Sequence, residues 1–182
     1  MKIKNTKTAY GLITILLHWV MAILLAVLFS MGLYMTSLDY YDSLYHSLPY
    51  WHKSFGILAI LLLLMRFSWR LKNIKPDDIN TQKNYEVLLA NFIQNVFYAL
   101  ILLIGITGYL ISTAKGKGIE FFYFMEIPAV TQFIDESVVD LVGEIHLTMA
   151  ILLSFLVLLH ASAALKHHFI DRDNTLKRMM KN

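Results

Sequence analysis

Four long apolar runs dominate the pattern of hydrophobic and polar positions, and short polar segments separate them. The runs cover residues 12–35, 52–70, 86–112 and 141–166. Each is near or above the ~20 residues that a helix needs to cross the hydrocarbon core of a bilayer. Short connections favour antiparallel neighbours. The pattern therefore predicts an all-α integral membrane protein, an antiparallel four-helix transmembrane bundle that forms a single domain over residues 1–182.

Two segments outside these runs need separate interpretation. The first run follows a basic stretch, as in a secretory signal, but it is longer than a signal core and lacks a small-residue cleavage pattern. We therefore interpret it as a retained helix. The longest connection, 113–140, mixes aromatic and acidic residues, and we expect an interfacial turn of helix there.

Composition and charge add an orientation to this arrangement. The chain is 57% hydrophobic with a mean hydropathy of +0.55, which is too apolar for a soluble domain of its size. Of its 16 Lys and Arg residues, all except Lys53, Lys115 and Lys117 fall on the side that carries both termini. The positive-inside rule predicts that both the N and the C terminus lie in the cytoplasm. The basic residues also suit anionic lipid, and no nucleic-acid motif is present.

Two histidines lie inside the last apolar run, which is an expensive place for a polar ring. His146 and His160 are 14 residues apart, close to four helical turns, so both point from nearly the same face about 21 Å apart along the axis. A single metal ion cannot bind both. A polar ring at membrane depth is a functional candidate because it requires a partner.

His18 and His52, on the first two runs, provide those partners. If the helices alternate across the membrane, His18 faces His160 near the cytoplasmic side and His52 faces His146 near the outer side. Two stacked bis-histidine pairs are typical of a di-haem cytochrome. Because the chain has no cysteine, the haem would be the non-covalent b type, and thiolate-bound iron–sulfur clusters are excluded. Zinc would need several ligands converging at one depth, which this spacing does not give.

Three further residues share faces with these histidines. Gly32 lies at the depth of the outer pair, where its missing side chain would let a porphyrin edge approach. Arg66 lies at the depth of the inner pair and could bind a haem propionate; the alternative is an arginine that snorkels to lipid phosphate. His167 could meet a quinone head group or a propionate, or could be an interface histidine without a role.

The third run carries polar residues in its cytoplasmic half. They fall on one side of the predicted helix: Asn91, Gln94, Asn95 and Tyr98. They could line a quinone or propionate pocket, and interhelical hydrogen bonding is the alternative.

Five segments resemble the bacterial cytochrome b561 family of four-helix di-haem b cytochromes: LLHW at 16–19, YHSLPYWHKSFGIL at 45–58, GYLISTAKGK at 108–117, EIH at 144–146 and LHASAALKHHFIDRDNTLKRM at 159–179. The resemblance is greatest to the YceJ branch and weaker to the superoxide oxidase branch, which passes electrons from superoxide to ubiquinone. It implies ligation of two haem b groups by His18, His52, His146 and His160, in the pairs given above. It also implies a multi-pass location in the bacterial inner membrane and a quinone site near His167, with ubiquinone as the redox partner.

Three functions remain open at this point. The first is electron transfer between membrane quinone and a periplasmic donor or acceptor, such as a redox protein; the second is superoxide oxidation; the third is a haem-containing anchor subunit of a larger oxidoreductase. Superoxide is an anion, and acidic residues outnumber Lys53, Lys115 and Lys117 on the outer side. The charge pattern therefore favours the first function over the second.

Overall fold

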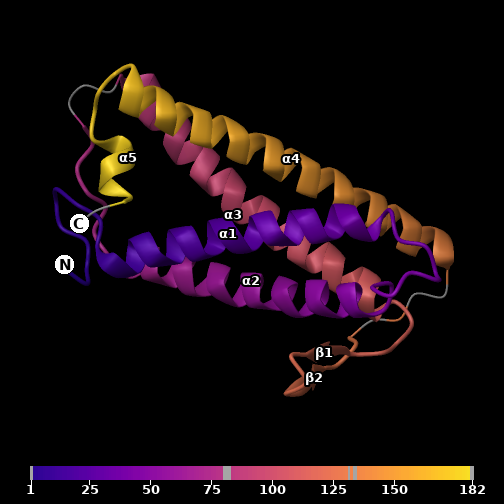
Figure 1. Ribbon diagram of the computed structural model, residues 1–182. Helices are drawn as coiled ribbons and strands as arrows, with labels where there is room; N and C mark the ends of the chain where they lie inside the picture. Colours follow the sequence, from indigo (N-terminus) through magenta and orange to yellow (C-terminus); the bar gives the residue numbers. More distant parts are fainter. Residues whose placement is uncertain (1, 80–82, 131, 133–134, 181–182) are drawn as a thin grey trace.

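The computed structural model describes residues 2–79, 83–130, 132 and 135–180. Within these residues the elements are α1 (Leu12–Met35), α2 (Ser47–Lys72), α3 (Asn84–Thr113), β1 (Ile119–Phe121), β2 (Met125–Ile127), α4 (Glu136–Phe169) and α5 (Thr175–Arg178) (Figure 1). Helices α1 to α4 are each long and apolar enough to cross a membrane. The predicted all-α membrane fold with four spans is confirmed.

The helix ends differ from the predicted spans because polar caps lie beyond the hydrocarbon. Helix α1 matches its predicted bounds, whereas α2 begins at Ser47 and α4 at Glu136, each about a turn earlier than expected. Pro49 sits in the first turn of α2, where its missing N–H removes no helical hydrogen bond. Asp135 caps α4 by accepting a 2.9 Å hydrogen bond from the backbone N–H of Ser137.

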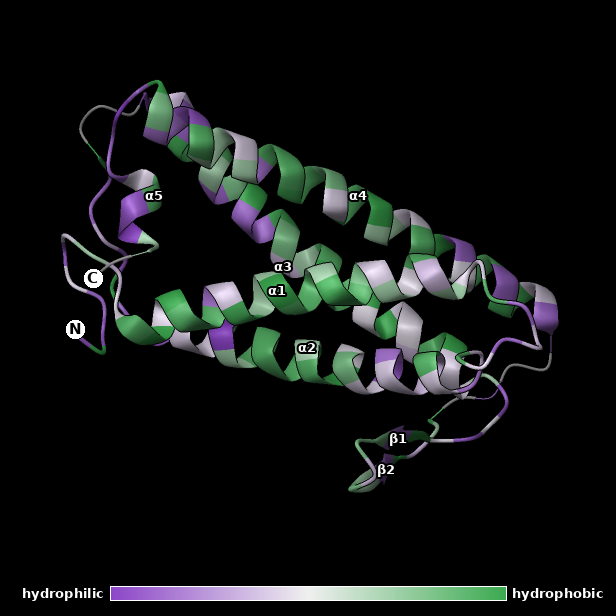
Figure 2. Ribbon diagram, in the orientation of Figure 1, coloured by the Kyte–Doolittle hydropathy of each residue, from purple (hydrophilic) through white to green (hydrophobic). Residues whose placement is uncertain are grey.

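The helices pack as neighbours in sequence order, α1 along α2, α2 against α3 and α3 along α4. Helices α1 and α4 touch over a short stretch only. Figure 1 shows these two helices diverging toward the end of the bundle that carries both chain termini. Apolar residues dominate all four helices, and polar residues gather at their ends (Figure 2).

A small buried core joins all four helices near the middle of the bundle. Its members are Met21, Leu63, Leu100, Ile101 and Leu153. These residues lie between the two histidine depths, so the core separates the inner pair from the outer pair. Many other apolar side chains along the helices are exposed, as expected for residues that face lipid.

The expected interfacial turn of helix is wrong, because an antiparallel hairpin occupies this part of the connection. Ile119 pairs with Ile127, and Phe121 pairs with Met125. Aromatic and β-branched residues favour strands. The mixture of apolar and acidic residues in this connection did not distinguish a strand from a turn of helix. The hairpin packs on α2, where the buried hydroxyl of Ser54 donates to the Glu120 carbonyl at 3.3 Å.

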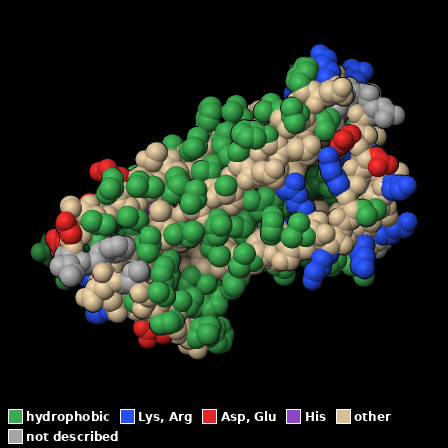
Figure 3. Space-filling model, turned by 180° about the vertical axis from the view of Figure 1, so that it is seen from behind, with side chains coloured by type: hydrophobic (Ala, Val, Ile, Leu, Met, Phe, Trp, Pro, Cys, Tyr) green, Lys and Arg blue, Asp and Glu red, His purple; other side chains and the backbone are tan. Residues whose placement is uncertain are grey.

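Hydrogen bonds tie together the segments at the end that carries the termini. The indole N–H of Trp19 donates to the carbonyl of Met179 at 2.7 Å, and the guanidinium of Arg178 donates to the carbonyl of Asp77 at 2.7 Å. Figure 3 shows that most Lys and Arg side chains on the visible face gather at this end. Lys181, one of the basic residues assigned to this side, lies outside the described residues.

Candidate functional site

The structure brings the four membrane histidines together in two pairs. His18 on α1 faces His160 on α4, with ring centroids 6.4 Å apart and ring planes at 65°. His52 on α2 faces His146 on α4, with centroids also 6.4 Å apart and planes at 70°. These are the pairs that the sequence spacing predicts, one at each depth of the bundle.

The separation within each pair fits one metal atom between two imidazoles. A metal–imidazole bond is about 2.0 Å long and each ring centroid lies about 1.1 Å behind its nitrogen, so two ligands across one metal place their centroids about 6 Å apart. Both observed separations are close to this value. The ring planes of both pairs are steeply inclined to each other, so the rings are not stacked face to face. Each pair can therefore hold the iron of a haem from both axial sides.

His146 has the hydrogen bonds that a metal ligand needs on its second nitrogen. Its Nδ1 lies 3.0 Å from the carbonyl oxygen of Ile104 and 3.1 Å from the hydroxyl of Thr107. A carbonyl can only accept, so Nδ1 carries the proton and Nε2 keeps a free lone pair. Such contacts orient ligating histidines and raise their basicity. The contact of Thr107 with His146 was not predicted from the sequence. The one indication in the sequence was a hydroxyl residue within an apolar helix.

Glycines leave room beside the outer pair. A Cβ at Gly32 would lie 3.4 Å from Cε1 of His52, and one at Gly108 would lie 3.0 Å from Cε1 of His146. A Cβ at Gly108 would therefore press on the His146 ring, whereas one at Gly32 would be in ordinary van der Waals contact with the His52 ring. A Cβ at Gly56, one turn after His52, would meet no atom within 4 Å, so space is open beside that ring. The three glycines thus keep side chains away from the His52 and His146 rings, as a flat macrocycle bound there would require.

Arg66 points into the bundle at the inner pair. Its Nη2 lies 3.1 Å from Nδ1 of His18, and the residue is half-buried. An arginine can only donate, so in this contact Nδ1 accepts and the ring proton is on Nε2. Metal ligation through Nε2 requires the opposite tautomer. With a metal on Nε2, Arg66 would need another acceptor, which a haem propionate could provide.

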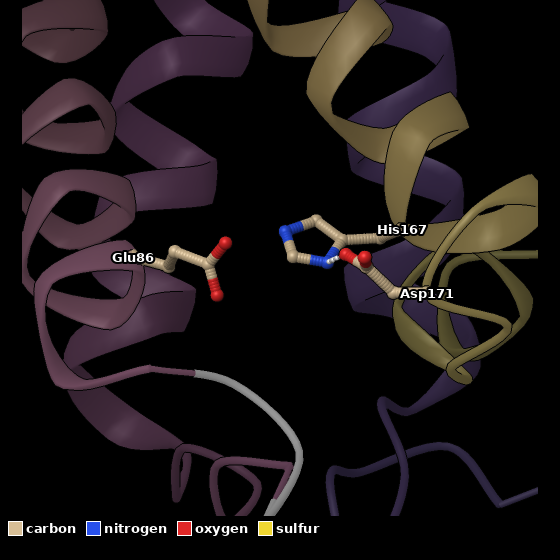
Figure 4. Close-up of side chains that lie close together, drawn as sticks. All are labelled: Glu86, His167 and Asp171. Carbon is tan, nitrogen blue, oxygen red and sulfur yellow. Dashed lines mark ion pairs between the residues drawn. The ribbon is translucent and has the colours of Figure 1, made fainter.

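Charged side chains form a network below the inner pair, where the start of α3 meets the end of α4. Nδ1 of His167 lies 2.9 Å from a carboxylate oxygen of Asp171 and 3.1 Å from one of Asp173. Nζ of Lys166 binds Glu86 at 3.1 Å and Asp171 at 2.7 Å. Figure 4 shows the His167 ring projecting between the helices toward Glu86. The Lys166 ammonium already compensates both carboxylates, which argues against a metal ion here.

The polar residues of α3 contact α2 and the segment that follows it. Nζ of Lys75 donates to Asn91 at 3.3 Å, and Arg70 donates to Asn95 at 3.4 Å. The Arg70 guanidinium also lies 5.4 Å from the ring centroid of Tyr98. These contacts favour the interhelical alternative for this polar face over a pocket lining.

A cavity of about 490 Å³ opens at the outer end of the bundle. It lies between the end of α1, the start of α2 and β1, and its polar lining includes Tyr45, His46, Tyr50, Lys53 and Glu120. Lys53 follows His52 directly in the chain. The cavity is therefore lined by a lysine that neighbours His52 in the chain.

Comparisons with known proteins agree on one family. Residues 9–182 match the model of a protein family described as "Prokaryotic cytochrome b561". The chain is 41% identical over 180 residues to cytochrome b561 homolog 2 of Escherichia coli K12, covering 99% of this chain and 95% of that protein. It is 28% identical over 166 residues to cytochrome b561 homolog 1 of the same organism, covering 91% and 93%. It is 29% identical over 176 residues to "Probable superoxide oxidase CybB" of Yersinia pestis, covering 94% and 95%.

Proposed function

Because the chain belongs to the prokaryotic cytochrome b561 family, we propose that it is a di-haem cytochrome that transfers electrons between membrane quinone and a periplasmic donor or acceptor. Family membership establishes the coarser statement: this is a multi-pass protein of the bacterial inner membrane that binds b-type haem and transfers electrons. The observation that carries the finer proposal is the presence of two facing histidine pairs at two depths.

The four histidines would hold the haems from three helices. His18 and His160 would bind the inner haem, and His52 and His146 the outer one. When bound, each haem iron accepts or releases one electron at a time, which allows transfer along the bundle axis. The protein fixes the ligands at both depths, because α4 contributes to both pairs and the apolar core lies between them. The basic end that carries the termini supports a cytoplasmic position for the inner pair.

His167 is the residue that we assign to the quinone. Reduction of a quinone to a quinol consumes two electrons and two protons, so its site needs a group that can pass protons. Carboxylate oxygens of Asp171 and Asp173 lie 2.9 Å and 3.1 Å from Nδ1 of His167. The other ring nitrogen, Nε2, points into the space between α3 and α4 (Figure 4). In its doubly protonated form the ring can donate Nε2–H to a quinone oxygen there and pass that proton to it, which returns the imidazole to its neutral form. Quinone is lipid-soluble and reaches this depth through the bilayer.

Superoxide oxidation is the second candidate, because Lys53 lines the outer cavity and one relative is named a superoxide oxidase. Glu120 lines the same cavity and opposes the capture of an anion. A third function, as a haem-bearing anchor for a separate catalytic subunit, would be recognised by a partner that purifies with the protein in fixed ratio.

Replacing Lys53, Lys115 and Lys117 together by glutamine tests the choice between the first two functions. We expect the rate of haem reduction by ubiquinol to stay unchanged, because these lysines lie at the opposite end from His167. Stopped-flow absorbance measures the rate, and Lys72→Gln at the inner end is the matched control. Rapid reduction of the wild type by superoxide, lost in the triple variant and masked by added salt, would instead establish superoxide as the donor.

Arg66→Ala should lower the reduction potential of the inner haem. Removing a positive charge from the neighbourhood of His18 disfavours the reduced, more negative iron site, and the size of the effect depends on the local dielectric. A redox titration followed by absorbance measures the shift. Arg66→Lys keeps the charge and should shift the potential less than Arg66→Ala. An unchanged potential in the alanine variant would show that Arg66 has no contact with the haem.

A further inference from the structure

The tip of the β1–β2 hairpin exposes three consecutive apolar residues. Tyr123, Phe124 and Met125 are 76%, 87% and 61% exposed. Figure 1 shows that the hairpin folds back along the side of α2 instead of extending beyond the outer end of the bundle. The tip therefore approaches the level of the spans, where the surrounding medium is lipid. Adjacent exposed apolar residues of this kind mark an interaction surface.

The backbone of this turn has a conformation that its side chains disfavour. Phe122 and Tyr123 have φ angles of 46° and 60°, in the left-handed region. Hairpin turns with two such residues usually contain Asn or Gly, and the conformation is an outlier for a bulky side chain. Aromatic residues at these positions must therefore gain something from their surroundings that offsets the backbone cost.

Contacts with α2 provide part of that compensation. The Phe122 ring packs on Phe55 with centroids 5.4 Å apart, and the Tyr123 ring stacks on Tyr50 at 4.4 Å. Ser54, fully buried, accepts a hydrogen bond from the backbone N–H of Phe122 at 3.3 Å. These contacts fix the hairpin to the outer end of α2. They leave Phe124 at the tip without such a packing partner among the described residues.

We propose that the hairpin tip is a lipid anchor, inserted into the head-group region of the outer leaflet beside α2. Aromatic residues favour this layer because it accepts both their apolar rings and their polar groups. The lipid-facing surface of α2 continues from the tip, with Leu61 and Leu64 both more than half exposed. A bilayer thus covers the tip and this helix face together, whereas a soluble protein partner could reach only residues above the head groups.

Two acidic residues limit how deeply the hairpin can insert. Glu120 on β1 lies directly opposite Glu126 on β2, and both are exposed. Ionised carboxylates are costly in hydrocarbon, so they stay among hydrated head groups. Only one strand residue on each side and the turn lie beyond them, so at a rise of about 3.3 Å per strand residue the tip reaches less than about 10 Å beyond them. That reach matches the 5–10 Å depth of interfacial anchors and does not extend to the bilayer centre.

Spin labelling can test this proposal directly, because the chain has no native cysteine. Phe124→Cys carries a nitroxide at the tip, and it leaves Phe122 and Tyr123 to hold the hairpin. Tyr41→Cys is the matched control, because Tyr41 is a 91% exposed aromatic in the α1–α2 connection. Both proteins are reconstituted with haem in phosphatidylcholine–phosphatidylglycerol vesicles, and haem absorbance confirms their fold.

Power-saturation electron paramagnetic resonance then compares collisions with oxygen, which dissolves in lipid, and with a water-soluble nickel complex. We expect several-fold fewer nickel collisions and more oxygen collisions at position 124 than at position 41. Nickel access at position 124 as high as that of a nitroxide on a water-soluble peptide would place the tip in water and overturn the proposal. Low access to both reagents at position 124 would place it in a protein contact and overturn it as well.

Discussion

Replacement of His146 by alanine is expected to remove the outer haem and leave the inner haem bound, whereas His160→Ala should have the opposite result. Each haem in the proposed arrangement takes one ligand from α4, and the two ligands are separated by about four helical turns. Losing one imidazole removes half of an axial pair without moving the other pair. Wild-type protein should contain two b-type haems with low-spin, bis-histidine spectra, and each variant should contain about half that haem.

Pyridine haemochrome assays and redox titrations of the purified variants measure these losses. His46→Ala is the control, because His46 is exposed before α2 and faces no other membrane histidine. An impermeant reductant added outside should reduce the haem that remains in His160→Ala faster than the one in His146→Ala. A single haem in the wild type would contradict the two-site arrangement, and reversed accessibility would contradict the assigned topology.

Replacement of His167 by alanine should slow haem reduction by ubiquinol without loss of haem. A positioned side chain that transfers a proton contributes roughly 10²–10⁴ to a rate, so we expect a decrease of at least about tenfold. His167 lies two turns beyond His160 and is not an axial ligand in this arrangement. Haem content, spectra and reduction by dithionite should therefore stay as in the wild type.

His168→Ala is the matched control for this experiment. His168 is the next residue of α4, and its ring packs against Phe169 instead of joining the carboxylate network. If the quinone site lies beside His167, only the His167 variant slows ubiquinol-driven reduction. Equal rates in both variants and the wild type would place the quinone elsewhere, and equal slowing in both would indicate a general disturbance of this helix end.

The four spans could be predicted from sequence because hydrocarbon imposes a length and a composition on any helix that crosses it. The pairing of His18 with His160 and of His52 with His146 followed from 14-residue spacing and alternating helix direction. The spans and the histidine pairs depend on regular helix geometry alone. The starts of α2 at Ser47 and of α4 at Glu136 were not predicted. Hydropathy identifies the part of a helix that lies in the hydrocarbon, and the caps and first turns lie outside it.

Features that depend on tertiary placement could not be predicted. The hairpin depends on the fit of Ser54 and its aromatic neighbours on α2, which no local pattern reports. Thr107 contacts His146 only because α3 and α4 pack at that depth. The contact of His167 with Asp173 requires the chain to turn back after α4, where Arg172 has a φ of 55°. These features need coordinates, since their partners come from distant segments or from irregular backbone.

The short contact between α1 and α4 has a consequence for how the protein matures. These helices carry His18 and His160, and they diverge where the inner haem would sit, so little side-chain packing holds them together there. The cofactor would then act as the packing partner of both helices, and its binding energy would count toward assembly of that end. A chain inserted before haem delivery would rely at this end on peripheral hydrogen bonds such as those of Trp19 and Arg178, and would be a better substrate for membrane proteases. Haem supply would therefore set how much of the newly made protein survives.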